Sequence, residues 1–309
     1  MLSEHKGWIL EAIARESALA CAFKINLIFI PGGKASLFRV KDLIKFLWNR
    51  KPKGNCLFIN QKSYFKVLKD SLINIDPARA SVLYTHYSSW RDSDKLEQAK
   101  LLNQCRKVYT LNSLDKVQLI KSGVKEVKIQ IVYGGVNRQV YFPQNSKAAL
   151  TYVLITGECK ERKSPKLIFD VIDNMRNVNF VIHGNGWKQY LSKLKIAHSS
   201  NLKIIDFHLR DNPKLMQEAS TYLSLSKLEG GPYTTIEALA SGTPCVVTST
   251  GWNPEIINKS NGILLPLEPK MAQIIPAIEQ ALLLKKKVQH LDLLDGKFSW
   301  EQLGRNLYS

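Results

Sequence analysis

Two glutamates, Glu229 and Glu237, stand eight positions apart in the segment KLEGGPYTTIEALASG. Gly230 and Gly231 follow the first of them, and glycine lets a backbone approach a ligand closely because it has no side chain. Pro232 then restricts the chain just before an alanine-rich stretch that predicts a helix. A carboxylate on each side of such a turn is suited to accept hydrogen bonds from the hydroxyl groups of a bound molecule.

The helix that begins near Thr234 predicts an anion site. Its first amides, those of Tyr233, Thr234 and Thr235, have no partner within the helix, and helix N-termini attract phosphate. Glu237 would project beside such a phosphate toward a ribose, and Glu229 toward the group that the phosphate carries. Charged hydrogen bonds of this kind contribute roughly 1.5 to 3 kcal/mol each. The alternative is that the helix dipole alone favours a glutamate near a helix start.

Short β-rich runs alternate with helix-like stretches along the chain. The runs of the first half are INLIFI, CLFIN, SVLYTHY, KVYTLN and KIQIVYGGV, and those of the second half are YVLITG, VNFVIHGNG, LKIIDF, TYLSLS, PCVVTS and GILLPL. Helical spacing of apolar residues lies between several of them, as in RVKDLIKFLWN and PKLIFDVIDNM. Strands that alternate with helices predict parallel α/β sheets.

Length and pattern together predict two domains. The chain has 309 residues, and a typical domain has roughly 150. The alternation breaks at PQNSKAAL, residues 143–150, where we place a boundary. We expect two doubly wound, Rossmann-like α/β domains in tandem, residues 1–145 and 146–288, that face a cleft. Ligands of such sheets bind beyond the carboxyl ends of the strands.

The first half of the chain carries most of its positive charge. The sequence has 44 Lys and Arg against 26 Asp and Glu, and residues 1–150 account for +14 of the formal net charge of +18. Such a field attracts polyanions, which include nucleic acid, anionic lipid headgroups and acidic polysaccharide. Nucleic acid is the least favoured partner, because the sequence shows no zinc-finger or recognition-helix motif and no aromatic platform among its basic residues.

Cysteines and apolar segments bear on the location of the protein. The five cysteines lack the paired spacing of a zinc site, and an odd number does not suggest a disulfide framework. The start of the chain shows no signal-peptide pattern. The apolar segment SALACAFKINLIFIPGG is broken by Lys24 and Asn26 and is shorter than the roughly 20 residues that span a bilayer. We expect a cytoplasmic protein, with any membrane contact peripheral and on the inner face.

The stretch EGGPYTTIEALASGTPCVV, residues 229–247, closely resembles the signature of the retaining glycosyltransferases of family 4, which have the two-domain GT-B fold. YGGVNRQVYFP is similar to the family's domain-linking segment and VLITGECKERKS to the first loop of its second domain. FSWEQLGRNLY resembles the last helix, so residues 289–309 are expected to cross back to the first domain. The resemblance implies sugar transfer from a UDP- or GDP-sugar to a saccharide or lipid-linked acceptor, with retention of configuration and no other cofactor.

The resemblance also assigns roles to single residues. It implies that Glu229 lies by the donor sugar, that Glu237 lies by the ribose, and that Lys163 binds the diphosphate. The family's usual arginine in that loop is Glu158 here. Arg162 is the nearest second cation, and a solvated surface role is its equal alternative.

Further positions follow from the same resemblance. His86 would face the donor sugar, and Gly7 would lie in the glycine loop of the first domain. His183 and Asn185, on either side of Gly184, would line the base or sugar pocket. Packing or turn roles are the alternative for His86, His183 and Asn185. Only six residues precede Gly7, so the first sheet either lacks its usual first strand or has a rebuilt loop.

The expected reaction requires a diphosphate to leave as negative charge builds on it. Lys163 and the amides at the helix start would stabilise that charge. Cations supplied by the protein can replace a metal, so we expect catalysis that is independent of metal. Other GT-B enzymes, such as an epimerase or a phosphorylase, and a binding-only descendant are the alternative readings of the same fold.

Overall fold

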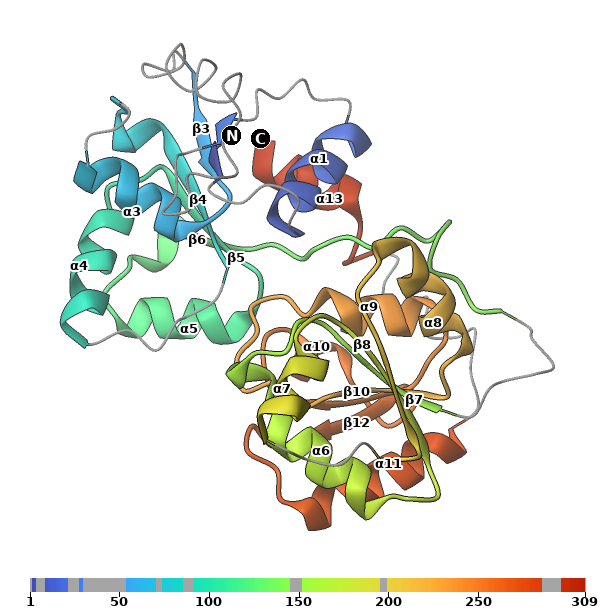
Figure 1. The fold of residues 1–309 in the computed structure, drawn as a ribbon. Helices are drawn as coiled ribbons and strands as arrows, with labels where there is room; N and C mark the ends of the chain where they lie inside the picture. Colours follow the sequence, from blue (N-terminus) through green and yellow to red (C-terminus); the bar gives the residue numbers. More distant parts are fainter. Residues whose placement is uncertain are drawn as a thin grey trace. The chain divides into compact units, whose positions relative to one another are not determined.

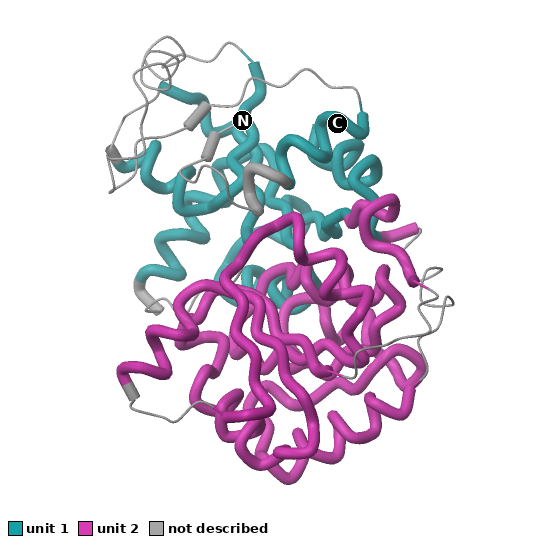
Figure 2. The backbone as a smooth tube through the Cα atoms, turned by 45° about the vertical axis from the view of Figure 1, so that its right-hand side comes forward, with its two compact units in different colours: residues 1–135, 298–309 teal, residues 136–297 magenta. Residues whose placement is uncertain are grey.

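The computed structural model describes residues 2–3, 9–21, 28–29, 54–70, 74–85, 92–144, 152–194, 199–284 and 296–308. The chain forms two compact units (Figure 2). Unit 1 comprises residues 1–135 and 298–309, and unit 2 comprises residues 136–297.

Unit 1 is built on a six-stranded parallel sheet with the order β2-β1-β3-β4-β5-β6 (Figure 1). Its strands are β1 (Leu2–Ser3), β2 (Ile28–Phe29), β3 (Cys56–Phe58), β4 (Ala80–Tyr84), β5 (Lys107–Thr110) and β6 (Ile129–Ile131). Its helices are α1 (Ile9–Ala20), α3 (Gln61–Asp70), α4 (Asp92–Leu102), α5 (Ser113–Lys121) and α13 (Trp300–Tyr308), and the 3-10 turn η3 (Glu126–Lys128) follows α5. Strand β1 precedes the segment that contains Gly7, so this sheet does not lack a first strand.

The last helix of the chain packs against the first. Gly304 of α13 lies so close to α1 that a Cβ atom there would come within 2.3 Å of the carbonyl oxygen of Ser17 and 2.6 Å of Cys21 Sγ. The hydroxyl of Tyr308 donates to the carbonyl oxygen of Ala14 at 3.1 Å. A residue without a side chain is required at this contact, and the contact holds α13 on unit 1.

Unit 2 contains a second six-stranded parallel sheet, with the order β12-β11-β10-β7-β8-β9. Its strands are β7 (Tyr152–Thr156), β8 (Asn179–His183), β9 (Leu202–Ile205), β10 (Thr221–Ser224), β11 (Cys245–Thr248) and β12 (Gly262–Leu265). Its helices are α6 (Pro165–Asn174), α7 (Trp187–Leu194), α8 (Asn212–Glu218), α9 (Tyr233–Ala240), α10 (Asn253–Ile256) and α11 (Met271–Leu283). The strand order reverses at β7 and β10, and ligands of such sheets bind beyond the carboxyl ends of the strands at this point.

Different helices cover the two faces of the unit 2 sheet (Figure 1). Helices α6, α7 and α11 share one core with the buried side chains Val153 and Ile155 of β7 and Phe180 and Ile182 of β8. Helices α8 and α9 lie on the other side of the sheet. Strands that are covered on both faces are apolar throughout, which is why the sequence shows continuous rather than alternating β-rich runs. The predicted α/β class with two parallel sheets is confirmed.

Candidate functional site

Three loops of unit 2 meet at the carboxyl edge of its sheet. They follow β7, β8 and β10, and the strand register pairs Thr156 with His183 and Tyr222 with Leu154. The strand order therefore brings the VLITGECKERKS loop, the HGNG turn and the Glu229 loop together, although they are far apart in sequence. This is the reversal point of the sheet, so these loops form the candidate site of unit 2.

Glu229 is held by two cations from the loop after β7. Its Oε1 atom lies 2.7 Å from Lys163 Nζ and 2.5 Å from Arg162 Nη1. The side chains of Glu229 and Lys163 are only 12% and 13% exposed, whereas that of Arg162 is 42% exposed. Arg162 also donates to the carbonyl oxygen of Leu228 at 3.0 Å, and its own carbonyl accepts the amide of Lys227 at 2.7 Å. The two loops are thus joined by side chains and by backbone.

The cations keep Glu229 ionised. Burial raises the pKa of its carboxyl, but the charges and hydrogen bonds of Lys163 and Arg162 outweigh burial and hold the pKa at about 2. With two cations against one carboxylate, this cluster keeps a net charge of +1. It can therefore attract a phosphate group while the carboxylate fixes both cations in place.

The backbone of the loop after β7 adopts conformations that position Lys163. Gly157 has a φ of 112°, a region that glycine enters without strain, and a Cβ atom there would lie 3.5 Å from Lys163 Cε. Ser164 has a φ of 54° and directly precedes Pro165, the first residue of α6. Glu158 pairs instead with Lys160 at 2.8 Å on the exposed side of the loop.

Gly184 lets the turn after β8 pack on the same loop. A Cβ atom at Gly184 would come within 2.0 Å of the carbonyl oxygen of Gly157, which is impossible without a backbone shift. The indole of Trp187 donates to that same oxygen at 2.8 Å. Asn185 makes a turn contact, because its Oδ1 accepts the amide of Phe207 at 3.0 Å. The geometry of Gly184 and Asn185 is that of residues that hold loops together.

Glu237 lies in a different environment from Glu229, with amide and phenol partners instead of cations. Asn212 Nδ2 donates to Glu237 Oε2 at 3.0 Å, and the hydroxyl of Tyr141 interacts with the same carboxylate. Burial raises the pKa of Glu237 to about 7, although Tyr141 and Asn212 both favour the charged form. Tyr141 and Asn212 could not be identified from the sequence, since neither VYFP nor DNPK carries a pattern typical of a site.

His183 is fully buried and supports Asn212. Its Nε2 atom accepts the amide of His208 at 3.1 Å, and its Nδ1 atom lies 3.3 Å from Asn212 Oδ1. The ring of Phe207 stacks on it with a centroid distance of 4.8 Å. Burial lowers the pKa of His183, so the neutral imidazole is favoured. Of the two roles considered from the sequence, packing within the protein is the one that the geometry supports.

The start of α9 corrects one expectation. The amide of Tyr233 donates to the carbonyl of Gly231 and that of Thr235 to the carbonyl of Pro232, each at 2.9 Å. The expectation that these two amides are free for an anion is therefore wrong, because a tight turn at the helix start uses them. The hydroxyl of Thr234 lies 2.6 Å from that of Tyr222.

Neighbouring backbone fixes the turn before α9. Gly251 has a φ of 57°, and a Cβ atom there would lie 2.8 Å from the carbonyl oxygen of Gly230 and 2.7 Å from Pro232 Cδ. The amide of Glu229 donates to Thr250 Oγ1 at 2.9 Å. The loop after β11 therefore presses on the glycine pair and holds Glu229 in its position.

Two predicted site residues, His86 and Gly7, lie outside the described residues. Among the residues that the structure describes, no cluster of three or more His, Cys, Asp or Glu could hold a metal ion. Within the same ranges, no helix has the length and apolar character needed to cross a membrane.

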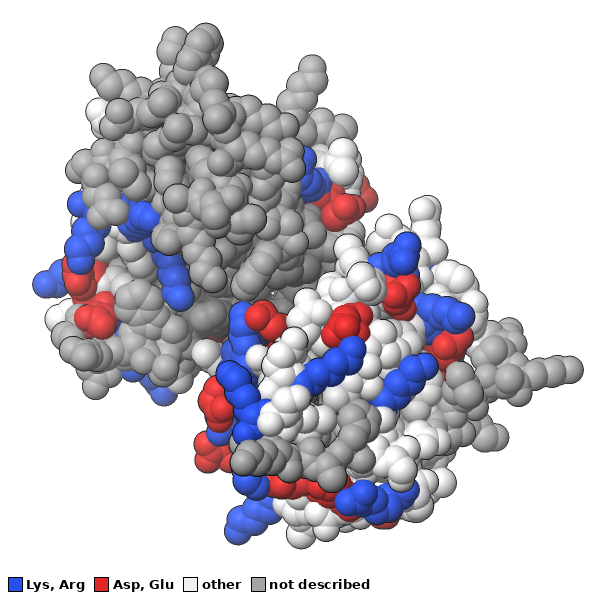
Figure 3. All heavy atoms as spheres, viewed as in Figure 1, with Lys and Arg blue, Asp and Glu red and all other residues white. Residues whose placement is uncertain are grey.

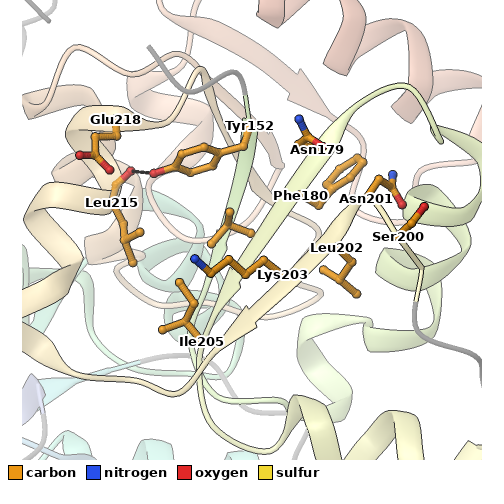
Figure 4. Close-up of a pocket in the computed structure, with 11 residues that line it drawn as sticks. Tyr152, Asn179, Phe180, Ser200, Asn201, Leu202, Lys203, Ile205, Leu215 and Glu218 are labelled. Atoms are coloured by element: carbon orange, nitrogen blue, oxygen red, sulfur yellow. Dashed lines mark hydrogen bonds between the residues drawn. The ribbon is translucent and has the colours of Figure 1, made fainter. Parts of the chain in front are cut away.

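One cavity of unit 2 lies beside these loops, and another lies away from them. One, of about 450 Å³, touches Ser164 and Lys227 beside the loop after β7. The other, of about 360 Å³, lies toward the amino ends of β7 and β8 and is lined by residues such as Tyr152, Asn179 and Lys203 (Figure 4). The second cavity contains none of the predicted site residues.

Comparison with known proteins connects this geometry with a family. The family model of the glycosyl transferases, group 1, matches residues 137–292. Spore coat protein SA of Bacillus subtilis (strain 168) is 23% identical over 219 residues, which cover 59% of this chain and 58% of that protein. The aligned part thus spans less than two thirds of that relative.

Solved structures share the fold at low sequence identity. HepE of Anabaena in complex with UDP-glucose is similar with a TM-score of 0.73 and 15% identity, over 99% of this chain and 97% of that chain. The lipopolysaccharide outer core galactosyltransferase WaaB is similar with a TM-score of 0.67 and 15% identity, over 99% of this chain and 95% of that chain. These likenesses extend over both units of the molecule.

Proposed function

This chain belongs to the glycosyl transferases, group 1, and we propose that it transfers a hexosyl group from a nucleotide sugar to a saccharide or lipid-linked acceptor. The observation that carries the proposal is the cluster of Glu229, Lys163 and Arg162 at the reversal point of the unit 2 sheet, with Glu237 on the helix that follows. A UDP-sugar is the preferred donor, because HepE binds UDP-glucose.

The cluster after β7 supports a role in binding the diphosphate of the donor. Lys163 and Arg162 carry two positive charges that Glu229 neutralises only in part. As the bond between the sugar and the phosphate breaks, negative charge grows on the leaving diphosphate, and fixed cations stabilise it without reorganisation. Glu229 would then lie by the donor sugar and Glu237 by the ribose.

We propose that the reaction retains the anomeric configuration and needs no divalent metal. The acceptor hydroxyl attacks the anomeric carbon on the face from which the phosphate leaves, the bond from that carbon to the phosphate oxygen breaks, and the proton passes to the leaving phosphate. The ion pairs with Glu229 hold Lys163 and Arg162 in place, and this supports the proposal that these two cations act in place of a metal. No covalent glycosyl-enzyme is needed for this course.

An anionic acceptor or membrane surface is proposed as the partner of unit 1. Along α5 and η3, the apolar side chains of Leu114, Val117 and Val127 are 46%, 46% and 87% exposed, and the exposed lysines Lys121 and Lys125 lie in the same segment. Apolar and basic side chains together favour the surface of an anionic bilayer. Figure 3 shows acidic side chains among the basic ones on the visible face of each unit. A cytoplasmic enzyme at the inner face of a membrane fits this arrangement.

Vesicle binding tests this partner. We expect cosedimentation with vesicles of phosphatidylglycerol and phosphatidylcholine, weaker binding at high salt, and a further loss in the double variant Lys121→Glu/Lys125→Glu. Binding that is indifferent to anionic lipid and to salt would reject the membrane partner and leave a soluble saccharide as the acceptor.

A panel of nucleotide sugars tests the activity itself. A donor at 100 times its dissociation constant should stabilise the protein by about 2.7 kcal/mol, so UDP-glucose, UDP-galactose and GDP-mannose are compared by thermal shift. Product analysis with the best donor then separates a glycoside from an epimer or a sugar phosphate. If no nucleotide sugar stabilises the protein, the proposal is wrong. Binding without turnover, in the presence of a range of acceptors, would favour the binding-only alternative.

A further inference from the structure

We propose that Tyr141 and Asn212 are positioning residues for Glu237, which they hold in the orientation that presents its carboxylate to the ribose hydroxyls of the donor. This inference rests on the proposed function, and it adds two residues from outside the signature segment. Tyr141 lies in the segment that precedes the unit 2 sheet, and Asn212 is the first residue of α8.

The three side chains come from separate parts of unit 2 and meet in its interior. Tyr141 is 7% exposed and Asn212 is 2% exposed, so water cannot readily replace either of them. Asn212 Nδ2 lies 3.0 Å from Glu237 Oε2 and 3.1 Å from the hydroxyl oxygen of Tyr141. Asn212 thus joins the other two side chains, and the hydroxyl of Tyr141 also interacts with the carboxylate and favours its charged form.

The directions of the two hydrogen bonds from Asn212 follow from its surroundings. The amide of His208 donates to His183 Nε2, so the proton of the neutral ring is on Nδ1 and is donated to Asn212 Oδ1. Asn212 therefore directs its NH2 group toward Tyr141 and Glu237. The hydroxyl oxygen of Tyr141 accepts one of these protons, and Glu237 Oε2 accepts the other.

The remaining capacity of the carboxylate matches a sugar diol. An ionised carboxylate has roughly four acceptor positions, and the hydrogen bond from Asn212 uses one of them. Glu237 as a whole residue is only partly buried. A carboxylate that is fixed on one side can accept hydrogen bonds from two adjacent hydroxyls on the other at little cost in entropy. The 2′- and 3′-hydroxyls of a ribose form such a pair.

Discrimination between ribose and 2′-deoxyribose reports on this orientation. We expect wild-type protein to bind UDP at least about 10-fold more tightly than 2′-deoxy-UDP, since a hydrogen bond to a charged group is lost. Where GDP is the nucleotide that binds, GDP and 2′-deoxy-GDP are compared instead. Tyr141→Phe removes one oxygen atom and keeps the ring, and we expect it to reduce this ratio by about 3-fold or more and to weaken binding of the ribonucleotide.

Tyr152→Phe is the matched control. Tyr152 is also buried in unit 2, and its hydroxyl donates to α8, at the carbonyl oxygen of Leu215, at 2.9 Å (Figure 4). This variant loses an equivalent hydrogen bond away from Glu237. It should therefore lower the melting temperature about as much as Tyr141→Phe does, while it leaves the preference for the ribonucleotide over the deoxyribonucleotide unchanged. Asn212→Ala is the second test variant, should Tyr141→Phe fail to fold.

The outcomes separate this inference from the proposed function. If wild-type protein binds no nucleoside diphosphate, the proposed function fails. If it binds with a clear preference for ribose and the folded Tyr141→Phe and Asn212→Ala proteins keep that ratio, only the positioning role is refuted. A loss of the ratio in Tyr152→Phe as well would also refute it, because a general loosening of unit 2 would then explain the effect.

Discussion

Replacement of Glu237 by glutamine should stabilise the protein in a way that depends on pH. In the folded protein burial raises the pKa of Glu237 from the ordinary 4.5 to about 7. A carboxyl with a raised folded-state pKa contributes stability that is fully present below pH 4.5 and is lost as the pH rises through about 7. Above that pH the wild-type protein keeps a charge that burial disfavours, and Glu237→Gln removes this charge.

The magnitude follows from the two pKa values. At pH 8 the ionised carboxylate lowers the free energy of unfolding by about 3 kcal/mol relative to a neutral group. Glutamine has one carbonyl oxygen in place of two carboxylate oxygens and loses one of the hydrogen bonds from Tyr141 and Asn212, at a cost of about 1 kcal/mol. The expected net gain at pH 8 is about 2 kcal/mol, or about 4–8 °C in melting temperature for a unit of this size.

Thermal and urea unfolding at pH 8 and pH 5 provide the assay. At pH 5 the folded wild-type carboxyl is already protonated, so Glu237→Gln should change stability by less than about 1 kcal/mol. Glu279→Gln, at an exposed position of α11, is the control and should have the same small effect at both pH values. An equal effect of Glu237→Gln at the two pH values, or a loss of stability at pH 8, would refute the reasoning. A gain in stability with a loss of nucleotide binding would identify Glu237 as a residue kept for function.

Three further outcomes are expected. Lys163→Met should lower kcat/KM by about 100-fold, because it removes one of the two cations beside Glu229 and the leaving phosphate; an unchanged value in transfer assays would contradict the role. Gly184→Ala should lower the free energy of unfolding by about 1–3 kcal/mol in urea titrations, since its Cβ atom would lie 2.0 Å from the carbonyl oxygen of Gly157. Chelation with EDTA should leave turnover intact, and a strict requirement for a divalent ion would reject catalysis by protein cations.

The alternation of β-rich and helical segments was sufficient to predict the class of the fold. The spacing of apolar residues and the length of each β-rich run identify strands that are buried on both faces, and helices between such strands indicate parallel sheets. In unit 1, one strand could not be predicted from the spacing of apolar residues. Strand β1 has only two residues, Leu2 and Ser3, and so short a strand has no periodicity that a sequence can display. Its place between β2 and β3 comes from pairing with distant segments.

The candidate site was predicted in part. The two glutamates could be singled out because charged side chains beside glycine and a helix start form a local pattern, whereas Lys163 followed from the resemblance to the family. Whether the amides at the start of α9 are free could not be judged in the same way, because the carbonyls of Gly231 and Pro232 accept those of Tyr233 and Thr235 in the folded turn. Tyr141 was also out of reach, since its hydroxyl meets Glu237 only after the chain has folded.

By itself, the sequence determined which side chains could do chemistry and that they would follow the strands of a parallel sheet, because both depend on residue type and short-range spacing. Tertiary structure alone decided the state of the two glutamates. Glu229 meets two cations and stays ionised, whereas Glu237 has an amide and a phenol as partners among the described residues and a pKa of about 7. Charge interactions and burial depend on neighbours brought together by the order of strands, and no spacing within a single segment specifies those neighbours.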